Sequence, residues 1–294
     1  MDAFSRTGGW WASMNKRTLL GLPGLTWYIL FLLAPLGITL VNSFLSSSAG
    51  GVLKPSFTLA NYLTILSDPT NLSLLLFTLR LSLIVTAVSF VVGYILGYYL
   101  ALMVKSVPVK MTLFFLFLTP FWIETTTKAI SWFPVLGESG FLNVLLMKTG
   151  LIREPISIFL FSQFSATMVM VVTYFLMMAA PVFLTLSRMD PVLLDAAQSL
   201  GADRIRTFYH VTWKLSLPGV IIGVAFVFVL SVSDFATPSI MGGVIQTIGM
   251  QIAYQTFSLA NFAAASAYST LITAITLGVV ALLFKIVDVT RLIF

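Results

Sequence analysis

The chain of 294 residues contains no cysteine and only one histidine, His210. Without cysteine it forms neither a disulfide nor a thiolate metal site. A metal site built from its own side chains would therefore depend on carboxylates, and the ten acidic residues are scattered along the sequence. We expect no bound metal and no cofactor.

Charged residues are also scarce. They make up 9% of the chain, against 59% hydrophobic residues and a mean hydropathy of +1.02. Soluble domains carry about 25% charged residues, so this composition excludes a soluble protein and indicates an all-α integral membrane protein. The formal charge of +6 does not indicate nucleic-acid binding, because the basic residues lie at the ends of apolar runs rather than in one patch.

The apolar runs predict about six transmembrane helices in a single domain covering 1–294. Each run approaches or exceeds the roughly 20 residues that a span needs. The first run lacks a signal-peptide cleavage pattern, so it should remain as a span. The expected spans are about 22–45, 74–104, 111–136, 158–184, 217–241 and 263–287.

Basic residues predict the orientation of these spans. Cytoplasmic flanks of membrane proteins are enriched in Lys and Arg. With both termini in the cytoplasm, the outer loops hold only Lys54, Lys148 and Arg153. The inner flanks then hold Arg6, Lys16, Arg17, Lys105, Lys110, Arg188, Arg204, Arg206, Lys214, Lys285 and Arg291.

One polar loop, at about 185–216, interrupts the apolar sequence most strongly. Asp190 can cap a helix that begins at Pro191. Gly201 can end that helix, because glycine tolerates the left-handed conformation. Asp203 can cap a second helix with Ile205, Phe208 and Val211 on one face. The loop therefore predicts a short helix, a glycine elbow and a second helix on one side of the membrane.

This loop resembles the signature loop of permease subunits of binding-protein-dependent ABC importers. The family pattern is Glu-Ala-Ala, three residues, Gly, and later Leu-Pro. Here Asp195 replaces the Glu, Ala196, Ala197 and Gly201 match, and Leu217-Pro218 closes the stretch. Trp213-Lys214 departs from the pattern, since many members have a first Leu-Pro there. The resemblance implies a type I importer permease in the bacterial inner membrane, with this loop docked on a cytoplasmic ATPase.

The coupling role implied by the resemblance falls on the short helix and on the charges that follow it. A capped helix with an elbow suits lever-like coupling, and charges can fix its register on a partner. The expected coupling residues are Asp195, Ala196, Ala197, Gly201, Arg204 and Arg206.

Ionisable residues inside spans indicate a candidate translocation path. Such residues are costly in the membrane and are usually functional. Glu124 and Lys128 lie four apart, so they form either a self-neutralising pair or a polar lining. Asp234 is either satisfied by neighbouring hydroxyls or exposed to the path. With Trp122 and Thr237 these residues form the expected path.

The segment DFATPSIMGG, from Asp234 to Gly243, resembles spermidine/putrescine-type permeases. The resemblance implies a small charged solute, for which a polyamine-like cation is our best interpretation. It also implies a second homologous permease and a periplasmic or surface solute-binding protein. We find no Gly-rich phosphate loop, so the chain is expected to be no enzyme in itself and to depend on ATPase subunits for energy.

Two other functions remain open. An ion-gradient-driven secondary transporter would usually show more spans or inverted repeats. An intramembrane serine protease is suggested by Gly137-Glu138-Ser139-Gly140, which resembles the rhomboid Gly-x-Ser-Gly. That enzyme needs a histidine within hydrogen-bond reach of the serine, whereas His210 is predicted on the opposite side of the membrane from Ser139.

Overall fold

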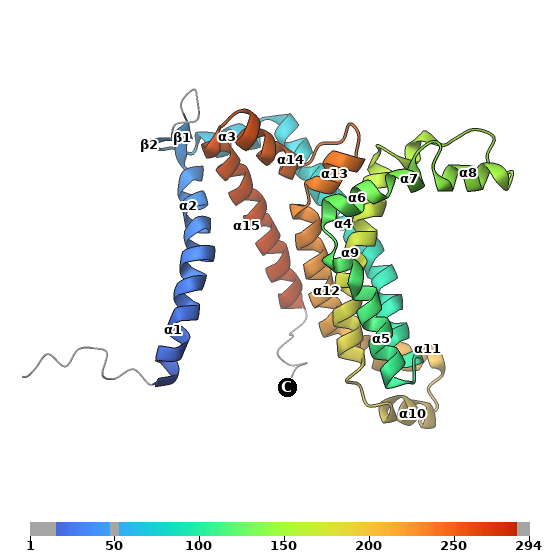
Figure 1. Ribbon diagram of the computed structural model, residues 1–294. Coiled ribbons are helices and arrows are strands. Elements are labelled where there is room, and N and C mark those ends of the chain that lie inside the picture. Colours follow the sequence, from blue (N-terminus) through green and yellow to red (C-terminus); the bar gives the residue numbers. More distant parts are fainter. Residues whose placement is uncertain (1–15, 48–52, 287–294) are drawn as a thin grey trace, which may run out of the picture.

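The computed structural model describes residues 16–47 and 53–286. Within these ranges the chain is helical except for one short hairpin. The helices run between two ends (Figure 1): the α10 end, which carries α10 and α11, and the hairpin end, which carries β1, β2, α3 and α14. The fold is therefore the all-α membrane architecture that the sequence predicts.

The first spanning segment lies at one edge of the molecule, where its second half packs against α15 (Phe262–Ile286). It consists of α1 (Lys16–Tyr28), the π-helix η2 (Ile29–Leu33) and α2 (Ala34–Ser43). β1 (Leu45–Ser47) then pairs antiparallel with β2 (Leu53–Phe57), and α3 (Ala60–Ser67) follows. The side-chain amide of Asn61 donates to the carbonyls of Ser43 and Leu45 at 3.0 and 2.9 Å. These bonds tie α3 to the end of α2.

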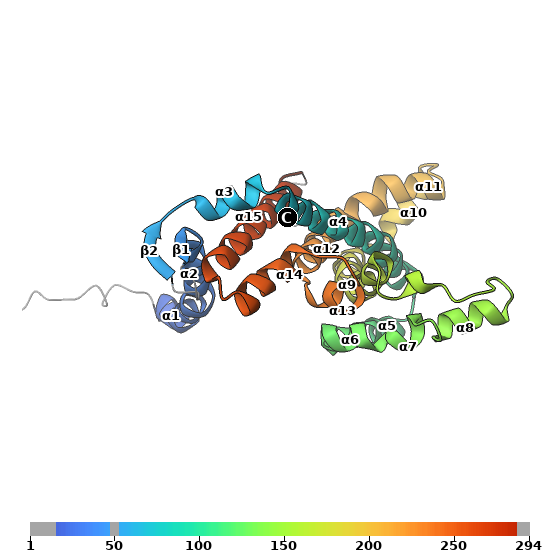
Figure 2. The same ribbon diagram turned by 90° about the horizontal axis from the view of Figure 1, so that it is seen from above.

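Three long helices form the packed centre of the molecule: α4 (Pro69–Tyr98), α9 (Gln163–Leu186) and α12 (Trp213–Ser233). A Cβ added at Gly93 would lie 2.6 Å from the Phe175 carbonyl oxygen, and one at Gly97 would lie 2.8 Å from that of Ala179. These two small residues, four positions apart, therefore allow α4 and α9 to pack closely. Viewed from above, α4 lies on one side of α9 and the row from α5 to α7 on the other (Figure 2).

The helix expected over 111–136 is interrupted. α5 (Val107–Leu118) passes into the 3₁₀ turn η4 (Thr119–Trp122), which contains Pro120, and a new helix begins after Glu124. α5 runs along α9, where Phe114 stacks on Phe183 at 4.5 Å. The following helices lie across the hairpin end (Figure 1). They are α6 (Thr125–Ser131), α7 (Phe133–Leu136) and α8 (Phe141–Lys148).

The helix expected over 217–241 is shifted and interrupted as well. It begins earlier, because α11 (Arg204–Thr207), the π-helix η6 (Phe208–Thr212) and α12 follow one another without a break. It ends at Asp234, where the backbone turns extended before α13 (Ala236–Met241). Pro218 therefore lies inside α12. The remaining elements are η3 (Tyr99–Met103), η5 (Ser157–Phe159), α10 (Val192–Ser199), α14 (Ile248–Ala253), η7 (Tyr254–Ser258) and α15 (Phe262–Ile286).

Six helical segments of the described chain are long and apolar enough to cross a membrane. One of them, Thr125–Lys148, consists of the separate helices α6 to α8, whereas the shorter apolar stretch Val107–Trp122 runs beside α9. The other five are Gly21–Ser43, Pro69–Met103, Ser157–Leu186, Arg204–Ser233 and Phe262–Lys285.

Candidate coupling surface and transport path

The loop at the α10 end has the local structure that its sequence predicts. The Asp190 carboxylate accepts a hydrogen bond from the Val192 N–H at 3.0 Å, and that of Asp203 accepts one from the Arg206 N–H at 2.7 Å. Gly201 has a φ of +87°, in the left-handed region, with no atom within 4 Å of where a Cβ would stand. The two caps and the glycine elbow are therefore confirmed.

The same loop exposes an apolar surface that nothing in the described chain covers. Leu200 is 90% exposed, and Ile205 and Val192 are also mostly exposed. Asp195 and Ala196 on α10 are exposed, and Ala197 is half-buried. α10 projects beyond the ends of the long helices (Figure 1). Exposed apolar side chains of this kind face either lipid or a partner protein.

An aromatic cluster connects this surface rigidly to the packed centre. The Phe208 ring lies 6.2 Å from the ring of Tyr94 and 6.0 Å from that of Tyr98, both on the α4–η3 helix. The Tyr94 hydroxyl lies 3.2 Å from the Ser216 hydroxyl on α12. Ile205 is exposed, whereas Phe208 and Val211 are half-buried, so the three residues expected on one face differ in burial. The π-helical turn changes the helical register after Thr207.

Asp234 lies buried at the break between α12 and α13, with 9% of its surface exposed. One carboxylate oxygen accepts a hydrogen bond from the Tyr174 hydroxyl of α9 at 2.9 Å. The other accepts one from the Thr237 backbone N–H at 3.0 Å. The carboxylate therefore joins α9, α12 and α13 at one point. The hydroxyl of Thr237 is buried without a hydrogen-bond partner among the described residues.

Glu124 and Lys128 lie at the start and in the last turn of α6, at the hairpin end of the molecule. Glu124 caps α6, accepting hydrogen bonds from the Thr127 N–H and the Thr126 hydroxyl, both at 3.0 Å. Lys128 is half-buried and interacts electrostatically with both Glu124 and Asp234.

The structure thus brings some of the expected path residues together and leaves one apart. α6 packs against α13, so Lys128, Asp234 and Thr237 share one region. Trp122 is instead 86% exposed at the end of η4. Tyr174 was missed by the sequence analysis, because a tyrosine within an apolar helix is usually a core residue and its partner lies 60 positions away.

The described chain offers neither a protease dyad nor a metal site. The loop between α7 and α8, which holds Ser139, and the η6 segment, which holds His210, lie at opposite ends of the molecule (Figure 1). His210 contacts the Arg206 carbonyl through its Nδ1 at 2.9 Å. Within residues 16–47 and 53–286, no group of three His, Cys, Asp or Glu side chains could hold a metal ion.

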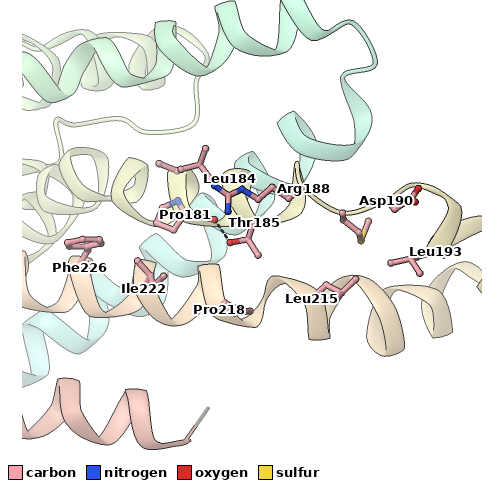
Figure 3. A pocket seen from close by; sticks show the side chains of 12 residues that line it. Pro181, Leu184, Thr185, Arg188, Asp190, Leu193, Leu215, Pro218, Ile222 and Phe226 are labelled. Carbon is pink, nitrogen blue, oxygen red and sulfur yellow. Dashed lines mark hydrogen bonds between the residues drawn. The ribbon is translucent and has the colours of Figure 1, made fainter. Parts of the chain in front are cut away.

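A cavity lies near the α10 end, between the last turns of α9 and the first turns of α12. Its volume is about 680 Å³. Apolar side chains and two prolines form most of its wall, and Arg188 is its one basic lining residue. Figure 3 shows the labelled side chains around this space. The sequence analysis did not predict this cavity, because its wall combines segments that are more than 20 positions apart.

Comparison with known proteins identifies relatives over most of the chain. No family model matches it. The spermidine/putrescine transport system permease protein PotB of Escherichia coli is 32% identical over 217 residues, which cover 74% of this chain and 78% of PotB. The inner membrane ABC transporter permease protein YdcU of the same organism is 30% identical over 273 residues, covering 84% of this chain and 85% of YdcU.

Solved structures agree on the fold. A chain of a bacterial ABC transporter involved in the import of the acidic polysaccharide alginate superposes with a TM-score of 0.71 at 16% identity, covering 96% of this chain and 98% of that one. A chain of the MetNI methionine ABC transporter gives a TM-score of 0.56 at 16% identity, over 76% of this chain and 99% of that one. With six apolar helical segments and these relatives, the chain belongs to the family of multi-pass inner-membrane permease subunits of ABC importers.

Proposed function

We propose that this permease forms, with a second homologous permease, the translocation path for a small polyamine-like cation. The observation that carries the solute class is the 32% identity to a spermidine/putrescine permease over 217 residues. A periplasmic or surface solute-binding protein delivers the solute to the hairpin end. The α10 end faces the cytoplasm, as do both termini, in keeping with the distribution of Lys and Arg.

Energy comes from cytoplasmic ATPase subunits that dock on α10 and α11, because the chain has no nucleotide site of its own. The exposed apolar surface around Leu200 supports this docking, and Asp195, Ala196 and Ala197 lie on the same short helix. Arg204 and Arg206 fix the position of α10 and α11 on the ATPase surface through their charges. Gly201 supplies the elbow between the docked helix and the helix that leads through Phe208 to the packed centre.

The outer part of the path is lined by Trp122, Glu124, Lys128, Asp234 and Thr237. Glu124 presents an exposed carboxylate at the hairpin end, where a cation would arrive. Asp234 is nearly buried and accepts two hydrogen bonds, so it influences the solute through its charge and by positioning α13. Lys128 interacts electrostatically with both acids and limits their combined attraction for a cation.

Reconstitution tests this proposal. The chain, its companion permease, the ATPase and the binding protein are placed in proteoliposomes, and uptake of labelled spermidine is followed with and without ATP. We expect uptake only with ATP, and we expect Asp195→Lys with Ala196→Glu to abolish it while the spans stay folded. Uptake driven by an ion gradient without the ATPase would instead identify a secondary transporter.

A further inference from the structure

The cavity at the α10 end differs chemically from the expected outer path. Pro181 and Leu184 of α9 form one wall, Leu215 and Pro218 of α12 form the other, and Leu193 of α10 also lines it. The cavity therefore lies between two core helices and the helix proposed to dock on the ATPase. A movement of α10 relative to α9 and α12 would change its shape directly.

Arg188 is the basic group of this cavity, and its charge is not used within the described chain. Its guanidinium points back along α9 toward Leu184 and Thr185, away from Asp190 (Figure 3). The Thr185 hydroxyl donates to the Pro181 carbonyl at 2.8 Å, and the Asp190 carboxylate accepts from the Val192 N–H. Neither polar neighbour is hydrogen-bonded to the guanidinium, so its positive charge acts on whatever enters the cavity.

We propose that this cavity is the exit of the path and that Arg188 is an electrostatic release residue. The inference rests on the proposed cationic solute. A cation attracted by acids at the hairpin end meets a fixed positive charge at the α10 end, which lowers its affinity there. Release into the cytoplasm is favoured, and cytoplasmic cation is hindered from binding again at the exit.

The size of this change in affinity can be estimated from the interaction between the charge of Arg188 and that of the solute. Two unit charges about 4 Å apart change a binding constant by on the order of fivefold even at the dielectric constant of bulk water. A polyamine carries more than one charge, which increases the effect, while the solvent exposure of Arg188 limits it through screening. We therefore expect removal of the Arg188 charge to raise the affinity of the exit for a polyamine about tenfold.

Proteoliposomes with the complete importer test the inference. They are loaded with increasing internal spermidine, and the initial rate of ATP-driven uptake of external labelled spermidine is measured. For Arg188→Gln, the internal concentration that halves uptake should fall about tenfold, whereas Arg188→Lys should behave as the wild type. Lys105→Gln is the matched control, because it removes an exposed positive charge from the α4–α5 loop and leaves the cavity unchanged.

A second variant tests the inference independently, in case Arg188→Gln misfolds. Leu184→Lys adds a positive charge at a half-exposed position of the cavity wall and should raise the half-inhibitory concentration. If the wild type, Arg188→Gln and Leu184→Lys are inhibited at equal internal concentrations, the release role is refuted although the importer works. If the wild type takes up no spermidine, the cationic solute itself is wrong and the inference falls with it.

Discussion

The glycine elbow between α10 and α11 gives the sharpest prediction about coupling. Gly201 has a φ of +87° and open space where a Cβ would stand, so a side chain there meets conformational strain and no collision. The left-handed conformation costs a non-glycine residue roughly 1–2 kcal/mol of free energy. A difference of this size changes a conformational equilibrium constant about 5- to 30-fold. Gly201→Val should therefore reduce the fraction of permeases with a correctly angled α10.

We expect Gly201→Val to lower the amount of solute transported per ATP hydrolysed about fivefold or more. Gly201→Asn should retain most coupling, because asparagine adopts the left-handed conformation more readily. Gly150→Val is the matched control, since Gly150 has a φ of +74° and equally open surroundings but lies after α8 at the hairpin end. The assay is parallel measurement of uptake and phosphate release in proteoliposomes. Equal coupling in Gly201→Val and Gly150→Val would refute the lever role of the elbow.

Three further predictions concern packing, the buried carboxylate and the outer acid. Gly93→Ala should lower the free energy of unfolding in detergent by about 1–3 kcal/mol, because the added methyl group overpacks against α9. The control Gly278→Ala should be neutral or slightly stabilising, since no atom lies within 4 Å of the added methyl group. Equal stabilities of the two variants would contradict the close approach of α4 and α9. Tyr174→Phe removes one hydrogen-bond donor from Asp234 and should lower the free energy of unfolding by about 1–3 kcal/mol. Asp234→Asn should change the kinetics of uptake and leave assembly intact. Unaltered uptake kinetics would place Asp234 outside the path. Glu124→Gln should raise the external spermidine concentration at half-maximal uptake, and an unchanged value would remove Glu124 from the entrance.

Features with local causes could be predicted from the sequence. Asp190, Gly201 and Asp203 act on backbone groups within three residues of themselves, so their pattern alone predicts two caps and an elbow. The four-residue spacing of Gly93 and Gly97 predicts a close helix contact, although not the partner helix. Hydropathy predicts most of the spanning helices, because the run of apolar residues is itself the physical requirement.

The interruptions and long-range contacts were harder to predict. Pro120 and the capping acid Glu124 mark the end of α5, but the surrounding apolar sequence suggested one continuous span. Asp234 ends α12 because its carboxylate bonds to α13 and to Tyr174, and the second of these contacts depends on how α9 packs. The exposure of Leu200 and the cavity beside Arg188 are likewise consequences of tertiary structure.

Site-specific cross-linking tests the docking of α10 on the ATPase most directly. The chain has no cysteine, so Ala196→Cys places its only thiol on the exposed surface of α10. Lys148→Cys places a matched exposed thiol on α8, at the hairpin end. After labelling with a short thiol-reactive photocross-linker in membranes that contain the ATPase, the account predicts an adduct between the two subunits for Ala196→Cys and none for Lys148→Cys. An ATPase that co-purifies yet forms no adduct with Ala196→Cys, or forms one with Lys148→Cys, would contradict it.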